Sequence, residues 1–291
     1  MLRVAFATWR SQPGLTADDA LAVEPLGRRG IVVEPAVWSA RSVAWEAFDA
    51  VVLRSCWDYH VRARAFARWV ERLAVRGIPV INAPPLVRWN LDKRYLADLA
   101  ARGVPVEPTV RLGRGQRADL GEILRSHGWS EAVVKPAISA SARGTWTTST
   151  GTSLADQARL DRLLARGAVL VQRLNDRIAT AGEWSVVFFA GEFSHAVVKR
   201  PAPGEFRVQE KLGGTLAPVE PSEALVRSAR AALDASVQAA PAGEPVYARV
   251  DGVPEGNRLV VMEVELIEPS LFLATAPAAA DRFAAAIAAA L

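Results

Sequence analysis

Two valine-rich segments near the C-terminal end carry charged side chains with regular spacing, at residues 247–252 (YARVDG) and 260–265 (VVMEVE). Their alternating residue types predict β-strands. Side chains two apart on a strand share a face, so Arg249 lies beside Asp251, and Glu263 lies beside Glu265. An unpaired charge on a buried strand is too costly, so these acids need a cationic partner. Several carboxylates at one point favour a hard cation such as Mg²⁺. Acids paired at the protein surface are the alternative.

The register of the hairpin decides whether these acids meet. Opposed residues of an antiparallel pair share a face, so we expect Arg249 to lie opposite Glu263. This arrangement requires an odd-length loop around residues 254–257, with a β-bulge at Gly256. A four-residue loop there would turn Glu263 away from Arg249.

Lysine is rare in this chain. Of 35 basic residues, the lysines are only Lys93, Lys135, Lys199 and Lys211. Arginine and lysine serve equally as surface charge, so a rare lysine indicates a position that needs a compact ammonium group. Chance is the alternative, and it applies first to Lys211. Lys135 and Lys199 each end an apolar predicted strand, and Lys93 begins a predicted helix.

Composition limits the class of protein. The chain has 291 residues, of which 51% are hydrophobic, enough for a globular protein of two or three subdomains. The net charge is +4, without a basic block interleaved with aromatics, so we expect anionic small ligands and no nucleic-acid partner. The single cysteine, Cys56, excludes an intrachain disulfide and fits the cytoplasm. The sequence predicts neither a signal peptide nor a membrane span, so we expect no membrane partner.

The elements that position these residues begin with alternating strands and helices. Strands are predicted at residues 2–7, 31–37, 49–54 and 80–82, and helices at 18–29 and 64–76. Such alternation predicts an open parallel sheet, with ligands beyond the carboxyl ends of its strands. Residues 83–85 (APP) end this pattern, so we expect a first domain over residues 1–85.

The rest of the chain divides into two further predicted parts. Residues 86–168 contain the strand that ends at Lys135 and a loop of small residues at 138–145. Backbone N–H groups and hydroxyls in such a loop can cradle phosphate oxygens, although a plain surface hairpin is the alternative. Residues 169–291 are rich in strands and end in an alanine-rich segment, which predicts a terminal helix.

Several features follow one another in a fixed order along the chain. They are a strand ending in lysine, a small-residue loop, an apolar strand, an acid that opens a strand, and the Arg-x-Asp and Glu-x-Glu segments. This series resembles the ATP-grasp superfamily. The resemblance implies an α/β pre-grasp domain with an open parallel sheet, followed by α+β ATP-grasp subdomains. It also implies an enzyme that uses Mg-ATP to activate a carboxylate as an acyl phosphate and then joins it to an amine.

The resemblance implies a nucleotide site at matching positions. Contacts to ATP would come from Lys93 and Lys135, from Ser139, Ser141 and Gly144 of the phosphate loop, from Gln172 and Leu174 at the adenine hinge, and from Glu183 at the ribose.

The resemblance also implies catalytic and metal-binding roles. Lys199 and Arg207 would reach the γ-phosphate region, and Arg249 would stabilise the transferring phosphoryl group. Mg²⁺, or Mn²⁺ in its place, would be held by Asp251, Glu263 and Glu265.

Three segments resemble one group of ATP-grasp proteins more closely, the D-cycloserine synthetases. They are residues 53–60 (LRSCWDYH), 90–93 (NLDK) and 262–271 (MEVELIEPSL). This resemblance implies cyclisation of O-ureido-D-serine to D-cycloserine in antibiotic biosynthesis, with release of ADP, phosphate, CO₂ and ammonia. A ligase that joins two amino acids is the alternative, and a nucleotide-binding regulatory protein without catalysis is a third. Trp57 and Tyr59 are expected to serve packing.

The substrate should be a small amino-acid-like molecule held by residues outside the ATP set. We expect Arg54 to pair with its carboxylate and Asp58 with its α-ammonium group. A salt bridge at the strand end is an equal alternative for Arg54. Glu268 and Ser270 follow the second acidic strand and should line the same cleft. ATP-grasp relatives are often dimers, so a homodimer is also expected.

Overall fold

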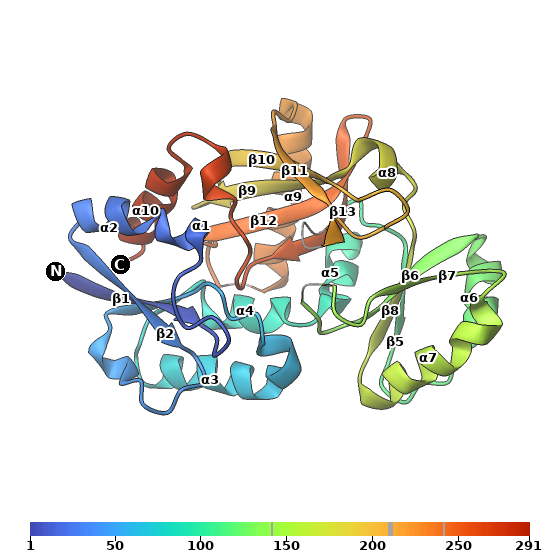
Figure 1. Ribbon diagram of the computed structural model, residues 1–291, viewed down its shortest axis with the longest axis horizontal. Helices are drawn as coiled ribbons and strands as arrows, with labels where there is room; N and C mark the ends of the chain where they lie inside the picture. Colours follow the sequence, from blue (N-terminus) through green and yellow to red (C-terminus); the bar gives the residue numbers. More distant parts are fainter. Residues whose placement is uncertain (141, 209–211, 241) are drawn as a thin grey trace.

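The protein has three parts arranged around one junction in a computed structural model that describes residues 1–140, 142–208, 212–240 and 242–291 (Figure 1). The N-terminal part contains β1 (Leu2–Thr8), α1 (Ala17–Ala20), α2 (Val23–Arg28), β2 (Ile31–Val37), β3 (Ala50–Leu53), α3 (Ala63–Val75) and β4 (Val80–Ile81). Two helices, α4 (Pro84–Asn90) and α5 (Leu96–Ala101), then lead toward the other parts.

The N-terminal sheet is parallel, with strand order β2-β1-β3-β4, which confirms the predicted open sheet. Alternate residues of β1 face opposite sides. Val4 and Phe6 share a buried cluster with Phe283, whereas Ala5 belongs to the cluster around Phe66 of α3. Both faces of the sheet are therefore covered, as expected for parallel strands.

The helix predicted over residues 18–29 is divided into α1 and α2. The division lies at Leu21 and Ala22, just before Pro25. Proline has no N–H group to bond the carbonyl of the residue four positions earlier, and its ring clashes with that carbonyl. A continuous helix through Pro25 is therefore excluded, and a new helix begins in its place.

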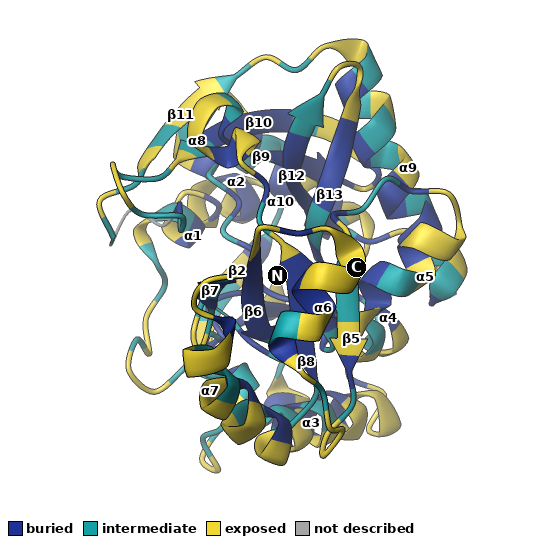
Figure 2. Ribbon diagram, turned by 90° about the vertical axis from the view of Figure 1, so that its right-hand side faces the viewer, coloured by how far each residue is buried: buried dark blue, intermediate teal, exposed yellow. Residues whose placement is uncertain are grey.

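The middle part is a four-stranded antiparallel sheet of order β5-β8-β6-β7 with two helices on its outer face. Its elements are β5 (Thr109–Leu112), α6 (Leu120–His127), β6 (Glu131–Pro136), β7 (Trp146–Ser149), α7 (Ser153–Arg166) and β8 (Val169–Arg173). In Figure 2 the strands β6 and β8 are largely buried, whereas α7 exposes its outer side. Val134 faces the helices, and its neighbours Val133 and Lys135 face inward. Since β8 pairs with β5 and β6, we propose a boundary after Arg173 instead of after residue 168.

The C-terminal part is a five-stranded antiparallel sheet of order β11-β10-β9-β12-β13. Its elements are α8 (Arg177–Ala181), β9 (Glu183–Phe189), β10 (Glu192–Arg200), β11 (Thr215–Val219), α9 (Glu223–Ala239), β12 (Tyr247–Glu255), β13 (Arg258–Glu265) and α10 (Ala279–Ala289). Helix α9 covers one face of this sheet, where Ala248 and Val250 are buried. Helix α10 confirms the predicted terminal helix and packs beside α2, so both chain ends lie on the same side of the molecule (Figure 1).

The β12–β13 hairpin brings the predicted charged residues to one face, but in a register that differs from the expected one. Arg249 lies opposite Glu265, and Asp251 lies opposite Glu263. The expected pairing of Arg249 with Glu263 was therefore wrong by two residues. The shared face was correct, because a shift of two residues preserves the side on which each side chain lies.

A bulge in the strand, and not an odd-length loop, produces this arrangement. The turn between Glu255 and Arg258 contains only Gly256 and Asn257, and the register shifts between Asp251 and Gly252. The unpaired residue is Met262 of β13, so the bulge lies opposite the step from Asp251 to Gly252 and not at Gly256. A Cβ atom at Gly252 would collide with the carbonyl oxygen of Val260, so this close approach requires glycine.

Among the residues that the structure describes, the helices all lack the length or the apolar character that a membrane crossing needs.

Candidate active site

A cavity of about 530 Å³ lies where the three parts meet. Its walls come from β6 and β8 of the middle sheet, from β9, β10, β12 and β13 of the C-terminal sheet, and from the segment before α3. Most residues that the sequence singled out line it, namely Lys93, Lys135, Ser139, Gln172, Glu183, Lys199, Arg207, Arg249, Asp251, Glu263, Glu265, Glu268 and Ser270. The cavity therefore joins side chains that are up to 177 positions apart in the sequence, from Lys93 to Ser270.

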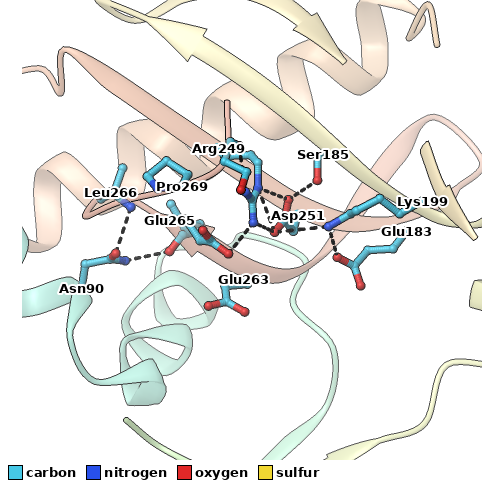
Figure 3. Close-up of polar contacts among 12 residues, drawn as sticks. Asn90, Glu183, Ser185, Lys199, Arg249, Asp251, Glu263, Glu265, Leu266 and Pro269 are labelled. Carbon is cyan, nitrogen blue, oxygen red and sulfur yellow. Dashed lines mark hydrogen bonds and ion pairs between the residues drawn. The ribbon is translucent and has the colours of Figure 1, made fainter. Parts of the chain in front are cut away.

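Arg249 is the centre of an ionic network on the β12–β13 hairpin (Figure 3). Its Nε and Nη2 atoms donate to the Asp251 carboxylate at 2.9 Å, and Nη2 also donates to Glu265. Ser185 on β9 also donates to the Asp251 carboxylate, at 2.5 Å. Burial opposes charge here, yet the facing carboxylates raise the pKa of Arg249, and Arg249 with Lys199 lowers the pKa of Asp251 to about 2. Both groups are therefore charged at neutral pH.

The cavity holds more buried carboxylate than this network neutralises. Burial, followed by the nearby carboxylates Glu263 and Asp251, raises the pKa of Glu265 to about 7 despite the opposing effect of Arg249. Burial and the charge of Glu265 raise the pKa of Glu268 well above its usual value. Removing carboxylates from water favours their neutral form, unless a cation approaches. The site is thus suited to a positively charged ligand or to a metal ion.

The chemistry of the donor set fits Mg²⁺, which prefers carboxylate oxygens and phosphates. Asp251, Glu263 and Glu265 share one face and line the cavity. In the part of the chain that the structure describes, no group of three or more acids, histidines or cysteines is arranged to hold a metal. These carboxylates instead contact Arg249 and the nearby lysines, and the assignment of the metal ligands stays a prediction.

Three of the rare lysines line this cavity. Lys93 donates to the Ser139 carbonyl at 2.5 Å and pairs with Glu263 at 2.9 Å. Lys135 donates to the side chain of Gln172 at 2.9 Å, and burial lowers the pKa of this lysine.

Lys199 pairs with Glu183 at 2.5 Å and lies 3.8 Å from Asp251. Each of these buried ammonium groups thus has an oxygen partner and faces a space large enough for further anions. The fourth lysine, Lys211, lies outside the described residues.

Only some of the residues predicted to contact the nucleotide from the small-residue loop and the hinge line the cavity. Ser139 lines the cavity, whereas Gly144, with φ of 76°, lies outside its lining. Ser141 lies outside the described residues. Leu174 at the predicted hinge does not line the cavity, although its neighbour Gln172 does. Arg207 lines the cavity and pairs with Glu205 at 2.7 Å.

Two residues chosen for the substrate lie elsewhere. Arg54 is buried, pairs with Asp19 at 2.8 Å, donates to the Pro269 carbonyl at 2.8 Å, and is absent from the cavity lining. A side chain with these partners is not available to a substrate carboxylate, so the salt-bridge alternative holds for Arg54.

Asp58 also lies outside the cavity lining. Its carboxylate accepts hydrogen bonds from Trp38 at 2.6 Å and from Arg62 at 3.1 Å. Because its carboxylate is bonded to these partners outside the cavity lining, Asp58 does not form the expected ammonium site. The neighbouring Trp57 and Tyr59 do line the cavity, although the sequence indicated only a packing role for them.

The sequence did not reveal how the outer edge of β13 is completed. Tyr95 both donates to the Val264 carbonyl at 2.7 Å and accepts from the Val264 N–H at 2.8 Å. Asn90 donates to the same carbonyl at 2.7 Å and accepts from the Leu266 N–H at 2.9 Å (Figure 3). These side chains replace a further strand and hold the acidic strand in place. The segment 90–93 was a motif of the resemblance, but nothing in it indicated this role.

The sequence also missed Glu107, a fully buried acid where the middle part joins the C-terminal sheet. Its carboxylate accepts from Arg173 and from Asn175, each at 2.7 Å, and its N–H donates to the Val261 carbonyl at 2.9 Å. Glu107 thus ties both chain connections of the middle part to β13. A lone acid between two prolines in an apolar segment was the available signal.

Comparisons with known proteins agree with this architecture. Residues 4–82 match the family model of the D-cycloserine synthetase DcsG N-terminal domain. The chain is 36% identical to the cycloserine biosynthesis protein DcsG of Streptomyces lavendulae over 269 residues, 89% of each chain. A crystal structure of D-cycloserine synthetase DcsG superposes with a TM-score of 0.90 at 33% identity, covering 99% of both chains.

More distant structures share the fold. A D-alanine–D-alanine ligase from Bacillus anthracis gives a TM-score of 0.68 at 16% identity, with 99% of this chain and 95% of that chain covered. At this identity the likeness supports only the arrangement of the three parts. With the relatives above, it shows that the chain belongs to the D-cycloserine synthetase (DcsG) family of ATP-grasp enzymes, which are ATP-dependent ligases that form C–N bonds.

Proposed function

We propose that this enzyme cyclises O-ureido-D-serine to D-cycloserine, with ATP as the source of energy. The observation that carries this proposal is the likeness to D-cycloserine synthetase, which extends over 99% of both chains and includes all three walls of the cavity. One molecule each of substrate, ATP and water would give D-cycloserine, ADP, phosphate, CO₂ and ammonia.

The proposed first step transfers the γ-phosphoryl group of ATP to the substrate carboxylate. The carboxylate oxygen forms a bond to phosphorus, and the bond from phosphorus to ADP breaks. Positioning and neutralisation of oxygen charge are the main requirements of such a transfer. Arg249 is charged, buried and fixed by Asp251 and Glu265, so it can stabilise the transferring group without reorganising. Lys199 and Arg207 would face the same phosphate.

The nucleotide would lie between the middle and C-terminal sheets. Lys135 and Gln172 would bind it from the middle sheet, and Glu183 from the C-terminal sheet, because these polar groups line the cavity from the two sheets. Ser139 would approach its phosphates from the small-residue loop, and Lys93 would do so from beside the loop, where it already donates to the Ser139 carbonyl.

Asp251, Glu263 and Glu265 are the proposed ligands for Mg²⁺. When bound, Mg²⁺ would neutralise phosphate oxygens and orient them for transfer. The carboxylates supply this binding only if Lys93 and Arg249 share them or move aside, because both cations contact them in this structure.

In the proposed second step, the nitrogen bonded to oxygen in the substrate attacks its own acyl phosphate. The new C–N bond closes the ring, phosphate leaves, and hydrolysis of the ureido group releases CO₂ and ammonia. A single substrate molecule satisfies this scheme. A ligase that joins two amino acids is the second candidate, favoured only by the general fold.

The experiment is ATP turnover by purified protein with Mg²⁺ and O-ureido-D-serine, with the products identified by mass spectrometry. Substrate-dependent ADP formation together with a cyclised product is the expected result. ADP formation only in the presence of amino-acid pairs would instead assign a peptide-forming ligase. Turnover with neither would refute the proposed substrate class.

A further inference from the structure

Glu268 differs from the other acids of the cavity. Within the described residues, Glu183, Asp251, Glu263 and Glu265 each form an ion pair with a lysine or arginine, whereas Glu268 forms neither an ion pair nor a hydrogen bond. The residue is only 7% exposed, and it lines the cavity. A buried carboxylate without a cation is costly, so this position is suited to a cation supplied by a ligand.

The surroundings of Glu268 favour an organic cation over a metal ion. Trp57, Tyr59, Ile267 and Phe272 line the cavity together with Glu268. Aromatic faces beside a carboxylate that has no cation of its own suit an ammonium group. Mg²⁺ instead requires several oxygen ligands in near-octahedral geometry. The aromatic walls would keep water away from the ion pair and thereby strengthen it.

The backbone around Glu268 is held in place by two buried arginines. Arg54 donates to the Pro269 carbonyl at 2.8 Å, and Arg249 donates to the Ser270 carbonyl at 2.9 Å. The segment that carries Glu268 is thus fixed to the N-terminal part on one side and to the phosphoryl-transfer site on the other. This rigid support is what a recognition group needs.

We propose that Glu268 binds the protonated amino group of the substrate, which makes the substrate an α-amino acid with its ammonium group beside the activated carboxylate. This inference rests on the proposed function. An α-amino acid carries both groups on one carbon, which matches an acid and a guanidinium that line the same cavity, where Arg249 donates to the Ser270 carbonyl two residues beyond Glu268. Binding as an ammonium ion also removes the lone pair of this nitrogen, so that it cannot attack the acyl phosphate of a second substrate molecule. Attack by the nitrogen bonded to oxygen closes the five-membered ring within one molecule.

The test compares binding of O-ureido-D-serine with binding of 3-(ureidooxy)propanoate, which lacks the amino group. Calorimetry is done on the wild-type protein and on Glu268→Gln, each with Mg²⁺ and a non-hydrolysable ATP analogue. Loss of a buried charge pair corresponds to a preference on the order of 100-fold. The wild type should show this preference for the amino compound, whereas Glu268→Gln should bind both compounds equally weakly and keep its nucleotide affinity.

Asp58→Asn is the matched comparison, because Asp58 lies near the same aromatic residues but is bonded to Trp38 and Arg62. It should retain the preference for the amino compound. If Glu268→Gln does not fold, Glu268→Asp replaces it and should show a weaker preference, because the carboxylate is withdrawn by one methylene group.

Three results would overturn the proposal. They are equal binding of both compounds by the wild type, an unchanged preference in Glu268→Gln, and a selective loss of nucleotide and Mg²⁺ binding in that variant. The last result would make Glu268 a metal ligand. If the wild type prefers the amino compound but forms no cyclised product, the ammonium site stands and the proposed reaction fails.

Discussion

Replacing Arg54 by methionine should destabilise the protein strongly, because the substitution leaves the carboxylate of Asp19 buried without a partner. The side chains of Arg54 and Asp19 are 2% and 3% exposed. The guanidinium also lies over the rings of Tyr247 and Phe283, at 5.3 and 5.4 Å from their centroids. Arg54, the residue after β3, therefore joins the N-terminal part to β12 and α10.

Breaking a buried ion pair by removing one partner costs about 3–5 kcal/mol of unfolding free energy. Total stabilities of about 5–15 kcal/mol mean that the variant should still fold. At roughly 2–4 °C for each kcal/mol in a protein of this size class, the melting temperature should fall by roughly 6–20 °C. The double variant Asp19→Asn with Arg54→Met should recover much of this loss, since it no longer leaves a charge unpaired.

Urea unfolding followed by tryptophan fluorescence measures this effect, together with KM for O-ureido-D-serine. Arg62→Met is the matched control. Its pair with Asp58 is 46% exposed on the arginine side, so it should change the unfolding free energy by no more than about 1 kcal/mol. A normal unfolding free energy with a raised KM in Arg54→Met would refute the structural role and return Arg54 to the substrate site.

Three further perturbations test the site. Arg249→Met should lower kcat on the order of 100-fold while leaving ATP affinity nearly unchanged, because the arginine acts on the transferring phosphoryl group. Steady-state kinetics and nucleotide titration measure the two quantities, and an equal fall in kcat and ATP affinity would contradict this role. Removal of Mg²⁺ by a chelator should abolish ATP turnover, and re-addition of Mg²⁺ should restore it. The Asp251→Asn variant should need a higher Mg²⁺ concentration for the same turnover, and full turnover by this variant at low Mg²⁺ would exclude the metal assignment. Tyr95→Phe should lower the unfolding free energy by about 1–3 kcal/mol, because the backbone of Val264 loses a hydrogen-bond donor and an acceptor at a buried strand edge. An unchanged free energy in urea unfolding would show that water replaces the hydroxyl.

Local patterns were sufficient for the order of the elements. The period of two along residues 247–252 and 260–265 correctly put Arg249 with Asp251, and Glu263 with Glu265, on shared faces. Strand periodicity is a property of the backbone alone, so it can be read without knowledge of neighbours. The rarity of lysine also singled out Lys93, Lys135 and Lys199, which all line the cavity.

The sequence by itself thus determined the alternating N-terminal elements, the shared faces of the acidic strands and the series of features that resembles the ATP-grasp superfamily. Only the tertiary structure decided the hairpin register, because the unpaired Met262 and the close approach of Gly252 to the Val260 carbonyl appear only when the two strands are paired. It also decided which charges are available: Arg54 and Asp19 are distant in the sequence and neutralise each other, while Glu268 has no cationic partner among the described residues. Pairing between charges depends on distance and burial in three dimensions, and neither quantity can be read from spacing along a chain.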